Sequence, residues 1–218
     1  MLKNIKEFMK KVAFRYTNLG APHYPYNIQP IQLSFLVSEL DRLINMKGNV
    51  LEIGVARGMT TFFLCHHILT QKVDSSFKYI AIDTFESFTD DDINYEVKER
   101  NKKKTDLVGF EYNSFEKWKK NMKDFKFLHA VKGDCSELEY LDFSPIKLSF
   151  IDVDLYLPTL NALKKIYELT IKGGVIVVDD VLENQAYDGA YYAYMDFCYS
   201  KNIEPKVIGD KCGIIYKN

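Results

Sequence analysis

The sequence predicts an α/β domain built on a doubly wound, mostly parallel sheet. Between residues 47 and 218, short apolar runs alternate with segments of helical spacing, and most of these runs end at glycine or aspartate. Short continuous apolar runs indicate strands buried on both faces, as in a parallel sheet covered by helices on both sides. This alternation predicts a layered domain whose ligand site lies at the carboxyl ends of the strands.

Length and charge restrict the class of protein. The chain has 218 residues, with 29 Lys and Arg against 30 Asp and Glu, so we expect no nucleic-acid partner. No apolar run approaches the length of a transmembrane segment. The scattered cysteines have no metal-ligand spacing and indicate reduced thiols in a cytoplasmic protein. They are Cys65, Cys135, Cys198 and Cys212.

The first 46 residues form a predicted helical extension of the main domain, which spans 47–218. Apolar residues from Ile5 to Val12 have helical spacing, and lysines interrupt them. We expect this helix to pack on the domain or on a partner subunit, and the alternative is a basic helix lying on a membrane surface. A second helix is predicted over 31–46, and its apolar face consists of Ile31, Phe35, Leu36, Leu40 and Ile44. A homodimer built through this extension is expected.

The first predicted strand and its turn, residues 49–61, have the features of a nucleotide site. The strand leads through Gly54 and Gly58 into a helix, whose free N–H groups face the turn. Glycine at these positions permits a close backbone approach by a ligand and tight packing of helix on strand. Ala56 replaces the middle glycine of a dinucleotide fingerprint, which argues against a pyrophosphate. Glu52 adds a carboxylate near the end of the strand.

The remaining elements follow the same alternation. Asp83 ends the second strand, where an acid hydrogen-bonds ribose hydroxyls or caps a turn. Gly133 turns after the third strand, and Asp134 is expected to begin a helix or to accept from an adenine amino group. The last two strands are predicted to be antiparallel. The strands after the first span residues 77–83, 125–131, 148–152, 175–178, 207–208 and 213–216.

A long polar insertion, about residues 86–124, interrupts the alternation. An insertion at this end of an α/β sheet is typical of a mobile lid over the site. Its acidic run, residues 90–92, indicates a solvated face, and a helix is expected over 113–122 with Trp118 in the core.

Acidic residues end four of the predicted strands, and the fold directs them into one crevice. They favour a cationic ligand or a divalent metal, since carboxylate oxygens suit Mg²⁺ or Ca²⁺. Capping of helix N-termini is the alternative interpretation. These residues are Glu52, Asp83, Asp152 with Asp154, and Asp179 with Asp180.

Four segments together resemble the macrocin/mycinamicin-type sugar O-methyltransferases, which are class I enzymes that use S-adenosylmethionine. They are residues 52–58, 83–88, 151–159 and 173–180, and the resemblance covers about residues 48–190. It implies a Rossmann-like, seven-stranded sheet with an antiparallel last strand, and Mg²⁺-assisted methyl transfer to a sugar hydroxyl. A small-molecule or nucleotide-sugar acceptor is the partner that it implies.

The resemblance also implies roles for individual residues. Asp152, Asp179 and Asp180 are expected to hold the metal, and Asp152 or Asp154 to act as general base. The residues expected to bind the cofactor are Glu52, Gly54, Val55, Ala56, Gly58, Thr60, Asp83, Thr84, Gly133, Asp134 and Asp152.

The chain departs from the family's usual pattern at three places. Val153 stands where glycine is usual, Val181 follows the Asp pair in place of tyrosine, and an arginine usual beyond Gly189 is missing. These departures concern the acceptor side. Two other functions use a similar fold: an NAD-dependent oxidoreductase, and a non-catalytic subunit that binds S-adenosylmethionine.

Overall fold

A computed structural model describes residues 2–71 and 77–218. The helices and strands expected around the first turn are present, in the expected order. The strands are β1 (Asn49–Ile53), β2 (Tyr79–Asp83), β3 (Leu128–Lys132), β4 (Ile146–Ile151), β5 (Thr170–Val178), β6 (Lys206–Ile208) and β7 (Cys212–Tyr216). The α-helices are α1 (Leu2–Tyr16), α2 (Pro30–Leu43), α3 (Met59–Thr70), α4 (Asp90–Arg100), α5 (Phe115–Asn121), α6 (Tyr156–Leu169) and α7 (Gly189–Ser200).

The strands form one seven-stranded sheet in the order β3-β2-β1-β4-β5-β7-β6. Strands β1 to β5 pair in parallel, and β7 runs antiparallel to both β5 and β6. This confirms the predicted Rossmann-like sheet. The direction of winding changes between β1 and β4, and a crevice opens at such a switch point outside the carboxyl ends of the strands.

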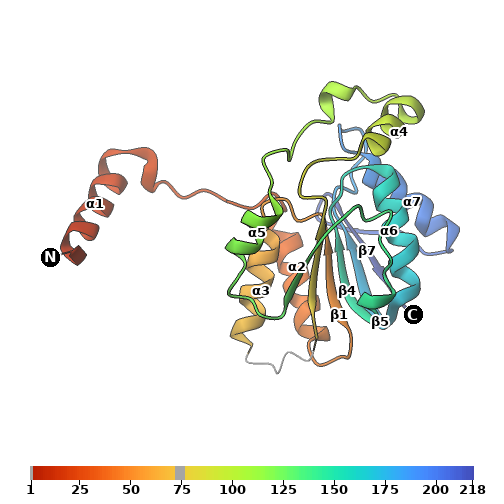
Figure 1. Cartoon of the computed structure of the whole chain (residues 1–218), viewed down its shortest axis with the longest axis horizontal. Helices are drawn as coiled ribbons and strands as arrows, with labels where there is room; N and C mark the ends of the chain where they lie inside the picture. Colours follow the sequence, from red (N-terminus) through yellow and green to blue (C-terminus); the bar gives the residue numbers. More distant parts are fainter. Residues whose placement is uncertain (1, 72–76) are drawn as a thin grey trace.

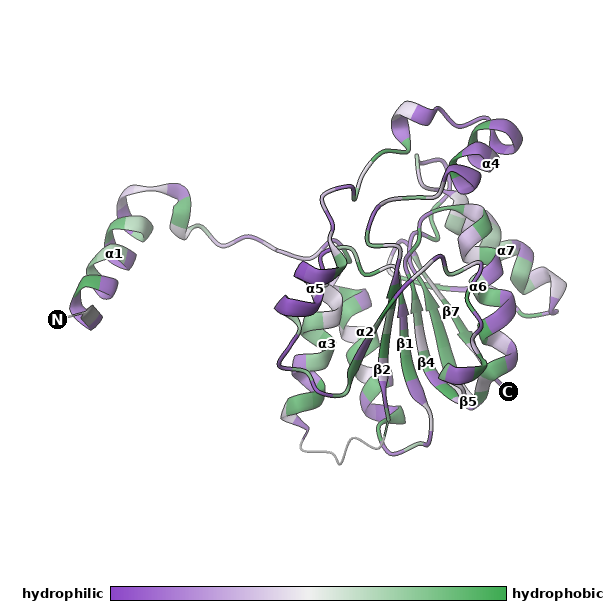
Figure 2. Cartoon of the chain, in the orientation of Figure 1, coloured by the Kyte–Doolittle hydropathy of each residue, from purple (hydrophilic) through white to green (hydrophobic). Residues whose placement is uncertain are grey.

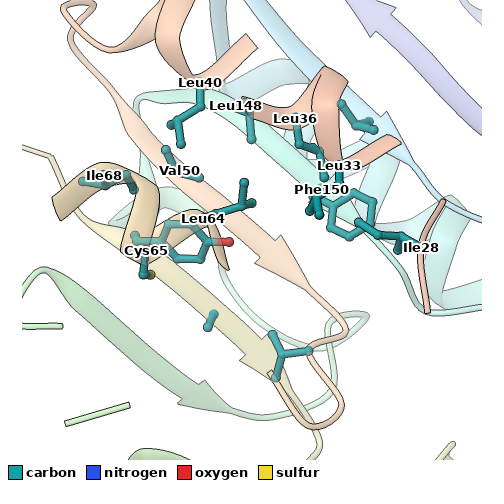
Figure 3. Packing of buried hydrophobic residues seen from close by; sticks show 14 of the residues in the cluster. Ile28, Leu33, Leu36, Leu40, Val50, Leu64, Cys65, Ile68, Leu148 and Phe150 are labelled. Atoms are coloured by element: carbon teal, nitrogen blue, oxygen red, sulfur yellow. The ribbon is translucent and has the colours of Figure 1, made fainter. Parts of the chain in front are cut away.

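Helices cover both faces of the sheet (Figure 1). Successive strand residues point to opposite faces, so β1 contributes Val50 to one core and Leu51 to the other. On the first face, α2 and α3 pack their leucines against Val50 and Leu148 (Figure 3). On the second face, α6 and α7 cover the alternate residues. The carboxyl ends of the parallel strands, which carry the predicted site residues, therefore lie at one edge of a sheet that helices hold in place on both faces.

Helix α2 belongs to the core, and its buried face agrees with the prediction at all but one residue. Leu33, Leu36, Leu40 and Leu43 are buried, whereas Ile31 is 51% exposed. Phe35 and Ile44 pack partly buried against the same cluster, so Ile31 is the residue of the predicted face that lies outside it. The helix begins one residue earlier than expected, at a proline, and its start fixes which positions face the sheet.

The link between β3 and β4 corrects a second prediction. No α-helix begins at Asp134 in the described chain; residues 135–137 form a turn, and a short 3₁₀ helix, Leu141–Phe143, precedes β4. The Asp134 carboxylate accepts the N–H of Ser136 at 2.7 Å. It caps a turn rather than a helix.

The insertion 86–124, called the lid below, contains α4, a 3₁₀ turn (Lys104–Asp106) and α5. Trp118 of α5 is buried in the core, as predicted. Helix α4 lies above the carboxyl ends of the strands (Figure 1) and contacts α6. Asp90 and Asp91 are exposed as expected, but Asp92 is buried. The acidic run is therefore a solvated face only in part.

Helix α1 stands apart from the domain on an extended link (Figure 1). Its apolar residues are exposed, with Phe8 65% and Met9 64% accessible. Helix α1 therefore does not pack on its own domain, and packing on a partner subunit stays a prediction. None of the described helices is long and apolar enough to cross a bilayer.

Candidate active site

A cavity of about 300 Å³ lies at the carboxyl ends of the parallel strands, beneath the lid. It runs from the end of β3 to the end of β5, a span of about 20 Å at the usual strand spacing. Its lining consists of Asn27, Ile53, Gly54, Ala56, Ile82, Asp83, Thr84, Ser87, Phe88, Thr89, Asp92, Phe110, Gly133, Asp134, Cys135, Asp152, Val153, Asp154, Pro158, Asp179, Asp180 and Lys211.

The turn between β1 and α3 is held by the carboxylate of Asp83. One oxygen accepts the N–H groups of Val55 at 2.8 Å and Ala56 at 3.1 Å, and the other accepts that of Phe85 at 2.6 Å. A carboxylate offers about four acceptor sites, so Asp83 keeps acceptor capacity on the cavity side. It both shapes the turn and lines the cavity.

The two glycines of this turn serve packing against protein. A Cβ on Gly54 would lie 1.7 Å from the carbonyl oxygen of Asp152, so glycine lets β1 and β4 end side by side. A Cβ on Gly58 would lie 2.7 Å from the indole nitrogen of Trp118, so this position receives α5 of the lid. Gly54 also lines the cavity, so the prediction that it admits a ligand close to the backbone stays a prediction. Gly58 packs against the lid rather than against the strand.

Glu52 does not line the cavity. Its side chain points into the core beneath α3, where it accepts the Tyr79 hydroxyl at 2.6 Å. Burial raises its pKa to about 7, against the opposing effect of that hydrogen bond. The alternation of strand side chains explains the difference, because Glu52 shares a face with Val50. Three other predicted cofactor residues, Val55, Gly58 and Thr60, are also outside the lining.

At the β3 end, the cavity is bounded by Asp134, Cys135 and the lid residue Asp92. Burial and the neighbouring Asp134 raise the pKa of Asp92 to about 6, although the Thr89 hydroxyl that donates to it lowers this value. With Asp83 nearby, this end combines carboxylate acceptors with apolar walls from Phe88 and Pro158. That composition fits a nucleoside: carboxylates for ribose hydroxyls and an amino group, and an apolar slot for a base.

At the other end, three carboxylates converge. Asp152, Asp154 and Asp180 each offer an oxygen, and these oxygens lie within 4.8 Å of one another. Burial and neighbouring aspartates raise the pKa of both Asp152 and Asp154 well above the ordinary value. Asp154 and Asp180 adopt left-handed backbone conformations, with φ of 63° and 56°. Such strain persists only where the surroundings impose it, and it often marks functional sites.

The structure differs from the prediction at Asp179. Its carboxylate accepts the Gln32 amide at 2.5 Å and lies 3.2 Å from the Lys211 ammonium, so it faces α2. Asp154 takes its place in the carboxylate group. The donor set of hard oxygens fits Mg²⁺ or Ca²⁺. Lys211 Nζ lies 2.6 Å from Asp180 Oδ1 and supplies positive charge at the same point.

Several lining residues were missed by the sequence analysis. Asn27 lies in a proline-rich loop, Lys211 lies in the turn before β7, and Phe88, Asp92 and Phe110 belong to the lid. No local pattern marks Asn27 or Lys211. The aromatic residues of a polar insertion were a usable signal, since apolar side chains in a lid usually face what it covers.

The fold is shared with many solved structures, among them NovP, CalS11 and Rv0187. The O-methyltransferase NovP aligns with a TM-score of 0.68 and 18% identity, over 86% of this chain and 79% of that one. CalS11, a calicheamicin methyltransferase, aligns with a TM-score of 0.68 and 16% identity, over 98% and 91%. Cofactor-bound Rv0187 from MTB gives a TM-score of 0.58 and 14% identity, over 98% and 96%.

Comparison with curated proteins gave no match. The family model described as Macrocin-O-methyltransferase (TylF) matches residues 33–218, from α2 through β7. This range contains the sheet, the lid and every lining residue of the cavity except Asn27. The chain therefore belongs to the macrocin O-methyltransferase (TylF) family.

Proposed function

We propose that this S-adenosylmethionine-dependent O-methyltransferase methylates a hydroxyl of a sugar, with a divalent cation at the carboxylate group of Asp152, Asp154 and Asp180. The observation that carries the proposal is the division of one cavity into two ends. One end has the composition of a nucleoside site, and the other holds the three converging carboxylates. Membership of an O-methyltransferase family argues against an NAD-dependent oxidoreductase and against a subunit without catalytic function.

The donor belongs at the end formed by β1, β2 and β3. Asp83 and Asp134 would accept hydrogen bonds from the ribose and the adenine, and Ala56 of the first turn would border the methionine part. S-adenosylmethionine supplies a methyl group on a positively charged sulfur. The acidic lining of the donor end favours such a cation.

The acceptor belongs at the end formed by β4 and β5. A divalent ion held there by Asp152, Asp154 and Asp180 would lower the pKa of an acceptor hydroxyl. Asp152 or Asp154 would take the hydroxyl proton on a carboxylate oxygen, because the bound cation would keep both groups ionised against the burial and neighbouring charges that raise their pKa without it. Phe88 and Phe110 of the lid would exclude water from the reacting atoms.

A nucleotide-linked sugar is the acceptor class that we favour. CalS11, which has the same fold, is described as a TDP-rhamnose 3'-O-methyltransferase. A sugar offers neighbouring hydroxyls, which suit one cation held by several carboxylates. The cationic Lys211 beside the carboxylates is the residue that we expect near an acceptor oxygen.

Calorimetric titration of S-adenosylhomocysteine tests the division of the cavity. We expect micromolar binding with Mg²⁺ and also with a chelator, because the donor end contains no predicted metal ligand other than Asp152. Asp134→Asn should weaken this binding at least about tenfold by removing a charged acceptor. Asp180→Asn should leave it within about twofold while abolishing methylation of a TDP-deoxysugar.

Two results would contradict the proposal. Equal loss of cofactor binding in Asp134→Asn and Asp180→Asn would show that the two ends do not have separate roles. Full methylation activity in the presence of a chelator would show that the reaction needs no divalent cation. The assignment of the donor end would then be unaffected.

A further inference from the structure

Helix α1 is an exposed amphipathic element that no described part of the domain covers. It is joined to α2 by a short 3₁₀ turn (Asn18–Gly20) and an extended segment, residues 21–29. Ile5, Phe8 and Met9 are 52%, 65% and 64% exposed. Exposed apolar groups in such a continuous set mark a surface that binds something.

The two sides of α1 differ sharply in chemistry. At 3.6 residues per turn, its main apolar residues fall within an arc of about 100°. They are Ile5, Phe8, Met9, Val12 and Tyr16. The opposite side carries the basic residues and one acid, so purple and green alternate along α1 in Figure 2. The charged residues are Lys3, Lys6, Lys10, Lys11, Arg15 and Glu7.

We propose that α1 docks the enzyme on the surface of an anionic lipid bilayer. A basic amphipathic helix lies in the membrane interface with its apolar side among the acyl chains and its cations beside the lipid phosphates. Helix α1 holds five of the chain's 29 basic residues but one of its 30 acidic residues. Helix α1 is therefore net basic, whereas the rest of the chain is net acidic.

The distribution of charge favours lipid over a second α1 helix. Lys6 and Arg15 flank the apolar arc on its two sides, so two α1 helices joined along their apolar sides would place cations next to cations. At a bilayer, the same flanking cations reach the phosphate level while their stems cover apolar surface. The extended segment 21–29 separates α1 from the domain, so the domain can lie clear of the membrane surface while α1 is bound to it.

Vesicle co-sedimentation of the full chain tests this proposal. The probes are vesicles of phosphatidylcholine alone and of phosphatidylcholine mixed with phosphatidylglycerol. We expect binding to the mixed vesicles that falls at least about tenfold between low and high salt, and weak binding to the neutral ones. Phe8→Ser should weaken binding at least about tenfold, because a buried phenyl group is lost.

Phe14 provides the matched control. It is a second exposed phenylalanine of α1, 73% accessible, and it lies among the basic residues on the other side. Phe14→Ser should keep vesicle binding within about twofold. Cofactor binding should be unchanged in both variants, because neither position contacts the cavity, and it shows that each variant is folded.

Three results would overturn the proposal. Equal binding to neutral and anionic vesicles would remove the electrostatic argument. Equal losses in Phe8→Ser and Phe14→Ser would remove the argument from the apolar side. A dimer in sedimentation equilibrium that Phe8→Ser dissociates, without vesicle binding by the unaltered chain, would assign α1 to a second copy.

Discussion

The carboxylate of Glu96, on α4 of the lid, accepts the backbone N–H of Tyr156 at 2.7 Å. This N–H opens α6, immediately after the loop that carries Asp152 and Asp154. The second Glu96 oxygen accepts Arg100 Nε at 2.8 Å, and Arg100 Nη2 donates to Asp188 at 2.6 Å. The lid is therefore anchored, through buried charges, to the loop that it covers.

Glu96→Ala is expected to reduce stability by about 3 kcal/mol, because it leaves Arg100 partly uncompensated and the first N–H of α6 without an acceptor. Thermal unfolding measures this loss, and turnover should fall as the acidic loop loses its support. Glu99→Ala is the matched control, because Glu99 is exposed on the same helix. Similar unfolding temperatures for the two variants would show that the buried network does not support the fold.

Gly54 and Gly173 form a pair that separates backbone strain from steric clash. Their φ angles are 82° and 79°, but a Cβ on Gly173 would meet nothing nearer than a Met46 methyl at 3.7 Å. Gly173→Ala should cost about 1–2 kcal/mol for the left-handed conformation alone. Gly54→Ala should cost more than about 4 kcal/mol, because its Cβ would overlap the Asp152 carbonyl and push β1 from β4. Equal costs in denaturant titrations would argue against this contact.

Lys211→Met tests the charge balance of the carboxylate group. The ammonium lies 2.6 Å from Asp180 Oδ1, so it competes with a divalent cation for the same oxygen. We expect the variant to bind Mn²⁺ about tenfold more tightly in calorimetry and to unfold at lower temperature without metal. Lys206→Met, an exposed position on β6, is the control. Unchanged Mn²⁺ affinity in Lys211→Met would mean that the lysine and the metal site are independent.

The pH dependence of stability should report Glu52. Its pKa rises from an ordinary value of 4.5 to about 7 in the folded protein, chiefly because of burial. Between these values the folded chain binds more protons than the unfolded chain, so this residue makes stability fall as pH rises from 4.5 to 7. The difference amounts to about 3 kcal/mol at neutral pH and above.

Glu52→Gln should remove that contribution while its amide oxygen still accepts from Tyr79. The variant should be more stable than the unaltered chain above pH 7 and show a smaller loss between acidic and neutral pH in urea titrations. Glu111→Gln, at an exposed position in the lid, should not alter the slope. If stability changed with pH equally in the unaltered chain and both variants, a group other than Glu52 would be responsible for that change.

The strands, their order along the chain and the acidic residues at the ends of four of them were predictable from the sequence. Continuous apolar runs such as residues 175–178 and the glycines before them are local signals, and local signals suffice for strands buried on both faces. The family resemblance then indicated the chemistry, because the motif 151–159 begins at the end of the fourth strand and the motif 173–180 contains the fifth. The predicted cofactor residues that line the cavity are Gly54, Ala56, Asp83, Thr84, Gly133, Asp134 and Asp152.

Only the tertiary structure decided which carboxylates share a site. Oxygens of Asp152, Asp154 and Asp180 converge, and Asp154 and Asp180 have left-handed backbone conformations. Asp179 accepts from Gln32 and shares Lys211 with Asp180. The Glu52 side chain points into the core and away from the cavity, because successive side chains of β1 point to opposite faces of the sheet. Asn27, Asp92 and Lys211 reach the cavity from segments far apart in the sequence. Strand signals are local, whereas a site is defined by distances between distant segments, and those distances exist only after the sheet has assembled.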